Sequence, residues 1–214
     1  MISETLTTIE SFLLGPLGNN SYLIFDTGSK EAAVIDPSFD PAPIRSRLDD
    51  LGLNLRYILL THAHFDHIAG VSDLVSSTSP HPIIAIHRLE MPLWNNRGAA
   101  NQFGFNLPAL QVPDFFLEDG IILELGNTRI QAVFTPGHTP GHLVFYISEI
   151  QVVFTGDLIF FRGVGRTDLP DGDSNLLYRS IDEKILTLPP ETRLLSGHGP
   201  ATSVADEMKM NPFI

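Results

Sequence analysis

The segment at positions 61–67 holds the residues best suited to chemistry. It reads THAHFDH, so three of the eight histidines lie within six residues. At a frequency of 8 in 214, three histidines at fixed positions arise by chance about once in 20,000 placements. Imidazole nitrogens and carboxylate oxygens that converge on one point bind metal ions. The segment predicts a metal site formed by His62, His64, Asp66 and His67, and an exposed polar turn is the less favoured alternative.

Three more ligand-type residues follow apolar, strand-like runs later in the chain. His138 lies in TPGHTPGH, Asp157 in FTGD and His198 in SGHG. Small residues beside them let the backbone approach a site closely. We expect these side chains to join the histidine segment. Because the chain has no cysteine, nitrogen and oxygen must hold any metal.

The elements that would position these residues are short and alternate in type. We expect strands at 9–14, 21–26, 32–35, 57–60, 83–86, 129–134, 143–147 and 152–154. We expect helices at 41–51, 67–75 and 176–188, the last capped by Ser174. Strand-like alternation is expected to place His62, His64 and Asp66 on one side, with His67 opening the next helix. Two rounds of strands and helices predict two packed sheets with helices outside.

Segment 91–116 breaks this alternation. It is rich in Asn, Pro, Phe and Leu, contains Trp94, and has no clear period of 2 or 3.6. Long irregular segments of this kind form lids and binding loops, or ordinary surface excursions. The sequence leaves both interpretations open.

Composition limits the partners and the compartment. With 25 acidic and 13 basic residues the formal charge is −12, which argues against nucleic-acid and anionic-membrane partners. The first ten residues lack basic residues and the apolar run of a signal peptide, so we expect a cytoplasmic protein. Length and evenly spread Gly and Pro predict one domain over 1–214. Either a monomer or a homodimer is expected.

The order HxHxDH, PGHT, TGD and GHG is similar to that of the metallo-β-lactamase-fold hydrolases, over nearly the whole chain. The resemblance implies an α/β fold, an αββα sandwich of two mixed β-sheets packed face to face with helices outside. It also implies a dinuclear site at one edge of the sheets. In that site His62, His64 and His138 hold the first metal, Asp66, His67 and His198 hold the second, and Asp157 bridges them. Asp66 and Asp157 are the expected catalytic residues.

Three features indicate the branch of this family. True β-lactamase branches lack an aspartate at the position of Asp157. GRTD at 165–168, and the ending from GHGP at 197–200 to NPF at 211–213, resemble the short, single-domain glyoxalase II-like (hydroxyacylglutathione hydrolase-like) proteins. Full-length glyoxalase II carries an additional C-terminal helical domain, whereas only 16 residues follow His198 here.

The implied reaction is thioester hydrolysis of the hydroxyacylglutathione type by a metal-bridging hydroxide. Metal coordination lowers the pKa of water to about 7. A thiolate, with a pKa of about 8.5, departs without full protonation. Two divalent ions, two carboxylates and a hydroxide sum to about +1, which predicts an anionic small-molecule substrate. Zinc is the expected metal, and iron and manganese accept the same ligands.

A second enzyme class competes. The run at 162–189 is also similar to persulfide dioxygenases, which use one iron held by equivalents of His62, His138 and Asp157. A complete second site, including His198, favours the hydrolase. A metal-binding module with a dead site is disfavoured because all seven expected ligands are present.

Further residues near the motifs receive secondary roles. Arg162 is a candidate to bind a substrate carboxylate, and Phe160 and Phe161 are candidates to wall the substrate pocket or simply to pack. We expect His142 to orient a ligand by a hydrogen bond, and Arg166 to pair with Asp168 and hold the loop of the bridging aspartate. Other expected features are a surface or core role for His81 and His87, a cap at Thr61, and a turn near the site at Asn20 and Ser21.

Overall fold

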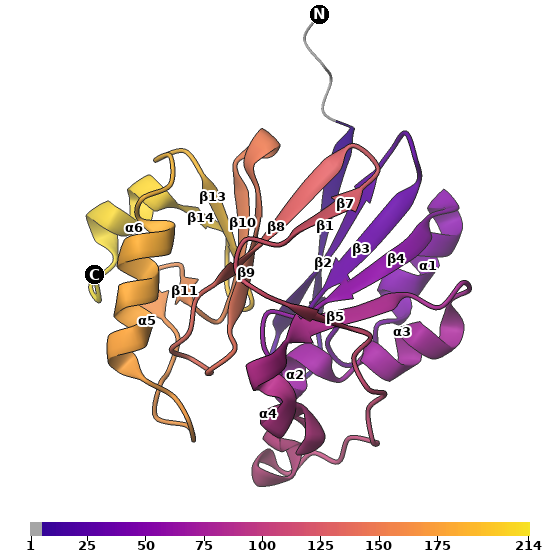
Figure 1. Cartoon of the computed structure of the whole chain (residues 1–214), viewed down its shortest axis with the longest axis horizontal. Coiled ribbons are helices and arrows are strands. Elements are labelled where there is room, and N and C mark those ends of the chain that lie inside the picture. Colours follow the sequence, from indigo (N-terminus) through magenta and orange to yellow (C-terminus); the bar gives the residue numbers. More distant parts are fainter. Residues whose placement is uncertain (1–5) are drawn as a thin grey trace, which may run out of the picture.

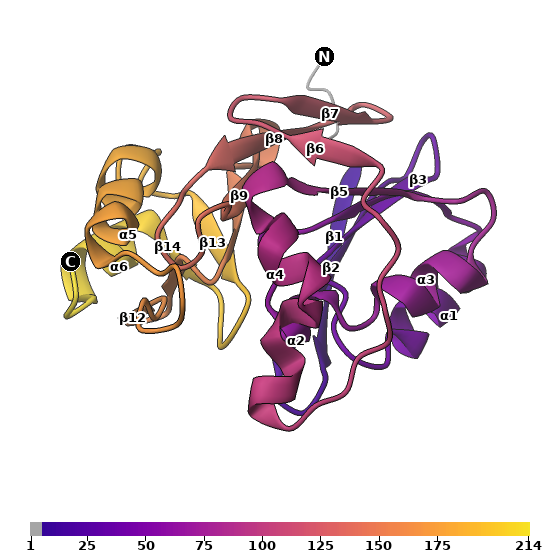
Figure 2. The same cartoon turned by 60° about the horizontal axis from the view of Figure 1, so that its bottom comes forward.

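Two six-stranded sheets lie face to face in the computed structural model, which describes residues 6–214 (Figure 1). The first sheet has the order β1-β2-β3-β4-β5-β6, and the second has the order β14-β13-β10-β9-β8-β7. Both are mixed, since β3 to β6 run parallel beside an antiparallel β1-β2-β3 edge, and β10 pairs parallel with β13. Helices cover the outer face of each sheet (Figures 1 and 2). The expected αββα sandwich is confirmed.

The strands of the first sheet are β1 (Thr7–Leu14), β2 (Asn19–Asp26), β3 (Glu31–Ile35), β4 (Asn54–Leu59), β5 (Ile83–His87) and β6 (Phe115–Leu117). Those of the second are β7 (Ile122–Leu125), β8 (Thr128–Phe134), β9 (Leu143–Ile147), β10 (Val152–Gly156), β13 (Arg193–Ser196) and β14 (Thr202–Ser203). A small hairpin of β11 (Ile159–Phe160) and β12 (Gly163–Val164) follows β10. All eight expected strands are present, with ends shifted by a few residues.

Alternation along each strand divides the buried side chains among three layers. In β4, Ile58 faces the helices outside the first sheet, whereas Tyr57 and Leu59 face the second sheet. In β9, Phe145 joins the layer between the sheets and Val144 joins the layer under the outer helices. Neighbouring strand residues point to opposite faces, so continuous apolar runs are needed where both faces are buried.

Within residues 6–214, four helices and two 3₁₀ segments accompany the first sheet, and two helices accompany the second. They are α1 (Ala42–Leu51), α2 (Phe65–Ile68), α3 (Val71–Ser77), the turn Arg88–Glu90, α4 (Met91–Asn95), the segment Arg97–Phe103, α5 (Ser174–Ser180) and α6 (Val204–Met210). A further 3₁₀ turn, Ser148–Ile150, joins β9 to β10. No helix of residues 6–214 is both long and apolar enough to span a membrane.

Two helix predictions need correction. The helix expected at 67–75 is two helices, separated by a turn at Ala69 and Gly70. Glycine is required in this turn because a Cβ at Gly70 would collide with the Ser38 carbonyl. The helix expected at 176–188 is α5 followed by a π-helical turn, Ile181–Ile185. Its cap is Asp173, whose carboxylate accepts the Leu176 N–H at 3.0 Å, and not Ser174, which is already helical.

Segment 91–116 is also more regular than its sequence indicates. It contains α4, the segment Arg97–Phe103 and the first residues of β6. Each helical piece has at most seven residues, too few to display a helical period. Asn20 and Ser21, expected in a turn, instead pair with Leu13 and Phe12 inside the β1-β2 hairpin.

Candidate metal centre

All seven predicted ligands meet at one edge of the two sheets. His62 and His64 follow β4, and Asp66 and His67 lie in α2. From the second sheet, His138 follows β8, Asp157 follows β10 and His198 follows β13. The strand-like alternation expected through Asp66 is wrong, because α2 already begins at Phe65. The helical turn nevertheless directs Asp66 and His67 into the same space.

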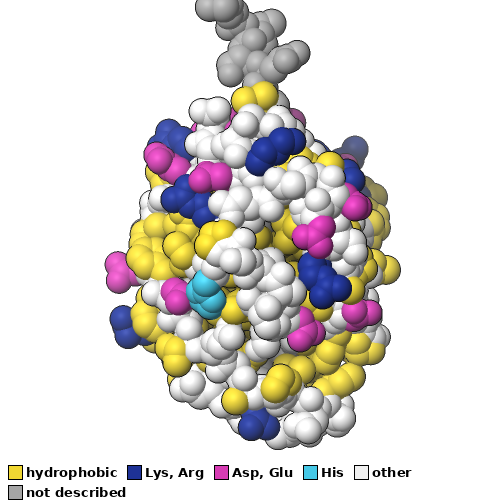
Figure 3. Space-filling model, turned by 90° about the vertical axis from the view of Figure 1, so that its right-hand side faces the viewer, with side chains coloured by type: hydrophobic (Ala, Val, Ile, Leu, Met, Phe, Trp, Pro, Cys, Tyr) yellow, Lys and Arg dark blue, Asp and Glu magenta, His cyan; other side chains and the backbone are white. Residues whose placement is uncertain are grey.

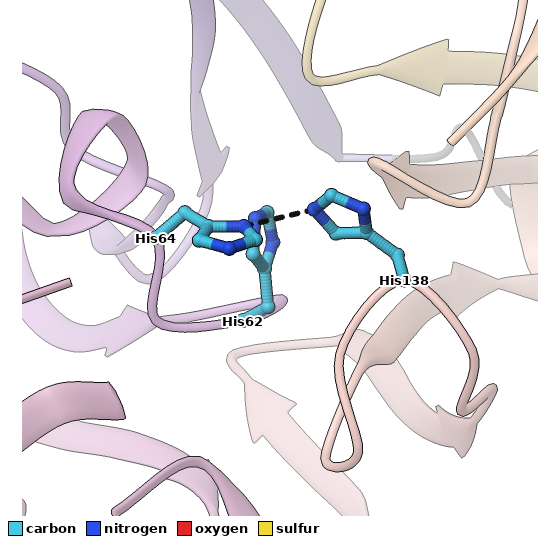
Figure 4. A group of neighbouring side chains, drawn as sticks. All are labelled: His62, His64 and His138. Carbon is cyan, nitrogen blue, oxygen red and sulfur yellow. Dashed lines mark hydrogen bonds between the residues drawn. The ribbon is translucent and has the colours of Figure 1, made fainter. Parts of the chain in front are cut away.

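The first group of side chains consists of His62, His64 and His138 (Figure 4). The Nδ1 atom of His64 lies 2.9 Å from Nε2 of His138. The His62 ring centroid lies 4.9 Å from that of His64 and 4.8 Å from that of His138. One nitrogen from each ring lies within 4.8 Å of the other two, close enough for all three to coordinate one ion.

The second group consists of Asp66, His67 and His198. Oδ2 of Asp66 lies 3.1 Å from Nε2 of His198 and 3.6 Å from Nε2 of His67. His62 and His67 have ring centroids only 4.1 Å apart, so the two groups are neighbours.

Asp157 lies between the groups and directs one oxygen at each. Its Oδ1 atom is 3.3 Å from Nε2 of His67 and 3.8 Å from Nε2 of His198. Its Oδ2 atom is 3.7 Å from Nε2 of His138. This orientation matches that of a carboxylate shared by two ions.

Three buried atoms at this point have no hydrogen-bond partner within residues 6–214: Nε2 of His62, Nε2 of His67 and Oδ1 of Asp157. Buried polar atoms are almost always paired, so unpaired ones that face one another indicate a missing ligand. A Cβ added at Gly197 would lie 2.5 Å from Oδ1 of Asp157 and 2.7 Å from the His67 ring. The space is therefore kept free of side chains, and its nitrogen and carboxylate donors suit a divalent transition metal.

Electrostatics differ between the two groups. Burial and the neighbouring His138 ring lower the pKa of His64 to about 3, and burial also lowers the pKa of His62 and of His138. Neutral imidazoles keep the lone pairs that a cation needs. Burial opposes charge on His67 too, but Asp157, Asp66 and Asp36 outweigh it and raise the His67 pKa well above its ordinary value. A bound cation would replace that positive charge among the carboxylates.

Asp36, at the end of β3, orients one ligand of each group and was missed by the sequence analysis. Its Oδ2 atom accepts from Nδ1 of His67 at 2.9 Å and from the Thr61 hydroxyl at 2.6 Å. The Thr61 hydroxyl lies 3.0 Å from Nδ1 of His62 and, having donated to Asp36, accepts that N–H. Both imidazoles then turn their Nε2 atoms to the site. The available signal was an acidic residue directly after the apolar run AAVI.

The remaining ligands are held from the second sheet. Nδ1 of His138 donates to the Arg166 carbonyl at 2.7 Å, and Arg166 forms the expected bidentate pair with Asp168 at 2.7 and 2.8 Å. His142 accepts the Asp157 N–H at Nε2, 3.2 Å away, and its Nδ1 lies 3.0 Å from the Thr135 hydroxyl. His142 therefore holds the backbone of Asp157, and it hydrogen-bonds a predicted ligand residue as the sequence analysis expects.

Glu90 connects the two ligand-bearing loops and was also missed. It is 1% exposed, and its two oxygens accept the backbone N–H groups of Ala63 and Gly141, each at 2.8 Å. Burial raises the pKa of this carboxyl. Ala63 lies between two ligands of the first loop, and Gly141 follows His138 in the second. One side chain thus sets the spacing of loops that come from different sheets.

Arg162 lies apart from the ligand groups. Its guanidinium pairs with the buried Glu207 at 2.9 Å and donates to the Asp206 carbonyl at 2.7 Å. It also lies over the Phe161 ring, 4.7 Å from the centroid. Phe160 is nearer to the site, with its ring centroid 6.2 Å from that of His198.

The two histidines expected to be uninvolved lie outside both groups. His81 is exposed, with Nε2 3.4 Å from Asp114, and His87 stacks on Phe134 with ring centroids 4.6 Å apart.

Comparison with known proteins places this arrangement in a family. The model of the metallo-beta-lactamase superfamily matches residues 14–198, which include every ligand described above. The chain belongs to this superfamily. The resemblance proposed from HxHxDH, PGHT, TGD and GHG is confirmed, as is the metallo-β-lactamase fold.

Metallo-β-lactamase relatives with two different activities are similar to this chain. Hydroxyacylglutathione hydrolase GloC of Haemophilus influenzae is 36% identical over 196 residues, which cover 91% of this chain and 92% of GloC. The human mitochondrial persulfide dioxygenase ETHE1 is 36% identical over 197 residues, which cover 90% of this chain and 70% of ETHE1. Among solved structures, TTHA1623 in a di-iron-bound form is 40% identical to this chain, with a TM-score of 0.86. The match covers 96% of this chain and 100% of the TTHA1623 chain.

Proposed function

We propose that the protein is a dinuclear metallohydrolase that cleaves thioesters of the hydroxyacylglutathione type. The observation that carries this proposal is Asp157, whose two oxygens face two complete groups of ligands. His62, His64 and His138 would hold one ion, and Asp66, His67 and His198 the other. Zinc is the metal we expect first, and the di-iron form of TTHA1623 supports iron as an alternative.

Cations bound at these groups would supply hydroxide at neutral pH and polarise the substrate carbonyl. The chain's own contribution is positioning. Asp36 and Thr61 fix the imidazoles of His62 and His67, and His142 fixes the backbone of Asp157. A thiolate leaves without a proton donor, which suits a site whose titratable side chains are committed to ligand positions. Two divalent ions, a hydroxide and the charged Asp66 and Asp157 would sum to about +1, which would favour an anionic substrate.

Persulfide dioxygenation is the second candidate, and the likeness to ETHE1 supports it. A single iron at His62, His138 and Asp157 would leave positions open for oxygen. That reaction has no use for the second group, whereas Asp66, His67 and His198 are all in place here. The complete second group is the reason to prefer hydrolysis.

Metal content and substrate turnover, measured on the same purified sample, separate the candidates. We expect two ions per chain. We also expect hydrolysis of S-lactoylglutathione, measured as the loss of the thioester absorbance. One iron per chain, with oxygen uptake on glutathione persulfide and no thioester cleavage, would reverse the assignment. A lactone, a phosphodiester and a β-lactam complete the panel, and preference for any of them would reject the thioester proposal.

A further inference from the structure

A largely apolar cavity of about 460 Å³ opens beside His64, a member of the first ligand group. It lies between the 89–103 segment, the loop after His138 and residues 169–171. Its apolar wall includes Leu89, Leu93, Phe103, Pro140 and Leu169. Binding sites for small molecules are mostly apolar and lie beside the few polar groups that orient the ligand.

The wall of this cavity is fixed to the metal-binding loop. Phe103 stacks on Phe65, the neighbour of His64, with ring centroids 5.3 Å apart. A Cβ at Gly98 would overlap the Phe65 backbone and the Ala63 carbonyl, so the segment lies directly on the loop. Arg97, Gly98 and Ala99 all adopt left-handed backbone conformations there. The cavity wall and the loop that carries His64 are therefore packed directly against each other.

Charge at the cavity is low and negative. Its lining, all within the described part of the chain, contains no Lys or Arg. The Glu90 carboxylate is already occupied by two backbone N–H groups, and Asp171 is exposed at the rim. An anionic group entering here would lose its hydration without meeting a Lys or Arg side chain, whereas an apolar group would gain from burial.

We propose that this cavity binds an apolar substituent on the acyl group of the substrate. The inference rests on the proposed thioesterase function and narrows its substrates to 2-hydroxyacyl thioesters with an aromatic or long aliphatic side chain. The thioester carbonyl must lie at the ligand groups, and His64 belongs both to them and to the cavity wall. The charged thiol carrier is then directed away from the cavity, into solvent.

Three glutathione thioesters that differ only in the acyl group test this proposal. S-lactoylglutathione carries a methyl group, S-mandeloylglutathione a phenyl group and S-succinylglutathione a carboxylate. We expect kcat/KM for the mandeloyl ester to exceed that for the lactoyl ester by about tenfold or more, because a hydrophobic pocket discriminates by roughly this factor. The succinyl ester should be the poorest of the three.

Leu89→Lys places a cation at the cavity, and the side chain of Leu89 is 52% exposed, so folding should be unaffected. We expect the mandeloyl preference to fall about tenfold and turnover of the succinyl ester to rise. Val112→Lys is the matched control, since Val112 is exposed in the same region but does not line the cavity. It should leave all three rates unchanged.

Equal kcat/KM for the lactoyl and mandeloyl esters, or a preference that Leu89→Lys does not alter, would overturn the cavity assignment. If no thioester is cleaved, the hydrolase proposal fails on its own, and calorimetry decides the cavity separately. Mandelate should then bind the metal-free protein about tenfold more tightly than lactate, and Leu89→Lys should remove the difference. Equal affinities would reject the cavity.

Discussion

Asp157 occupies the position on which both ligand groups depend. Burial would raise its pKa, but His67 and His138 outweigh burial and lower it, so the carboxylate is charged. Each oxygen faces a different group, and the backbone N–H is held by His142. A change at this residue should therefore affect both ions together.

Asp157→Ala should bind fewer than one ion per chain, because both groups lose a ligand. Its thioesterase activity should fall by more than about 100-fold. Elemental analysis and kcat on the same sample measure this. Asp182→Asn, at an exposed position on the π-helical turn, is the control and should retain both ions. Two ions bound to the Asp157→Ala protein would contradict a shared carboxylate.

Gly197 offers a test that removes no ligand. A Cβ there would lie 2.5 Å from Oδ1 of Asp157 and 2.7 Å from the ring of His67. Gly197→Ala should displace both side chains and reduce kcat about 100-fold, the effect of roughly 1 Å of misplacement. Gly163→Ala is the control, because its new Cβ would lie 3.8 Å from Phe160, an ordinary contact distance. It should leave kcat unchanged. Normal activity in Gly197→Ala would show that the space between the groups is not needed.

Among the elements, the loop after β4 and the loop after β8 are joined by Glu90. Its carboxylate accepts the N–H groups of Ala63 and Gly141 where no solvent reaches. The spacing of the two loops is set by this residue before any cation binds.

Glu90→Ala should leave two buried N–H groups without acceptors, at a cost of about 1–3 kcal/mol each. For a chain of this size we expect Tm to fall by roughly 5–20 °C, with weaker metal binding. Glu90→Gln keeps one acceptor oxygen, so its Tm and its metal binding should both fall less than those of Glu90→Ala. Glu149→Ala, at an exposed position, is the control. A Tm of Glu90→Ala within about 2 °C of the wild type would disprove the connecting role.

The side chains that converge and eight of the strands in the described chain were predictable because each was marked by a local pattern. Apolar runs of four to eight residues mark the strands, and His or Asp directly after a run marks the site. Asp36 met the same criterion in VID but stands alone, without a motif around it. Glu90 has no local pattern, because its two partners lie 27 and 51 residues away in sequence. Short helices such as α2 and α4 span too few residues to show a period.

For the whole molecule, the two sheets are connected at both ends. At one end the ligands come from both sheets. At the other, Asp26 of the first sheet accepts from Gly28 and Ser29 in its own turn and from Asn127 in the turn between β7 and β8, at 2.7 to 3.2 Å. Acidic and basic side chains are interspersed on the face over α1 and α3 (Figure 3), so the net charge of −12 is not concentrated there.

Asp26→Asn should lower the free energy of unfolding at pH 7 by about 1–2 kcal/mol, because an amide nitrogen cannot accept an N–H. Burial raises the pKa of Asp26, but the backbone hydrogen bonds outweigh it and lower the pKa below its ordinary value. The stabilisation is therefore present above about pH 4 and is lost as the pH falls further, when the folded carboxylate takes up a proton.

Urea unfolding between pH 7 and pH 3 measures this difference. The wild type and Asp26→Asn should converge at the acidic end, whereas Asp50→Asn on α1 should match the wild type throughout. If the free energies of unfolding of wild type and Asp26→Asn differed by the same amount at every pH, the charge on Asp26 would not contribute to stability.

The β1-β2 hairpin holds the loop that carries His198. The Asn20 N–H donates to the Gly197 carbonyl at 2.7 Å, its side-chain amide donates to the carbonyls of Ser196 and Gly199, and the Tyr22 hydroxyl donates to Ser196. A chain without its first two strands would retain all seven predicted ligands in its sequence. It would nevertheless lose the hydrogen bonds that hold the loop of His198, so two segments more than 170 residues apart in the sequence must both be in place before this loop is fixed.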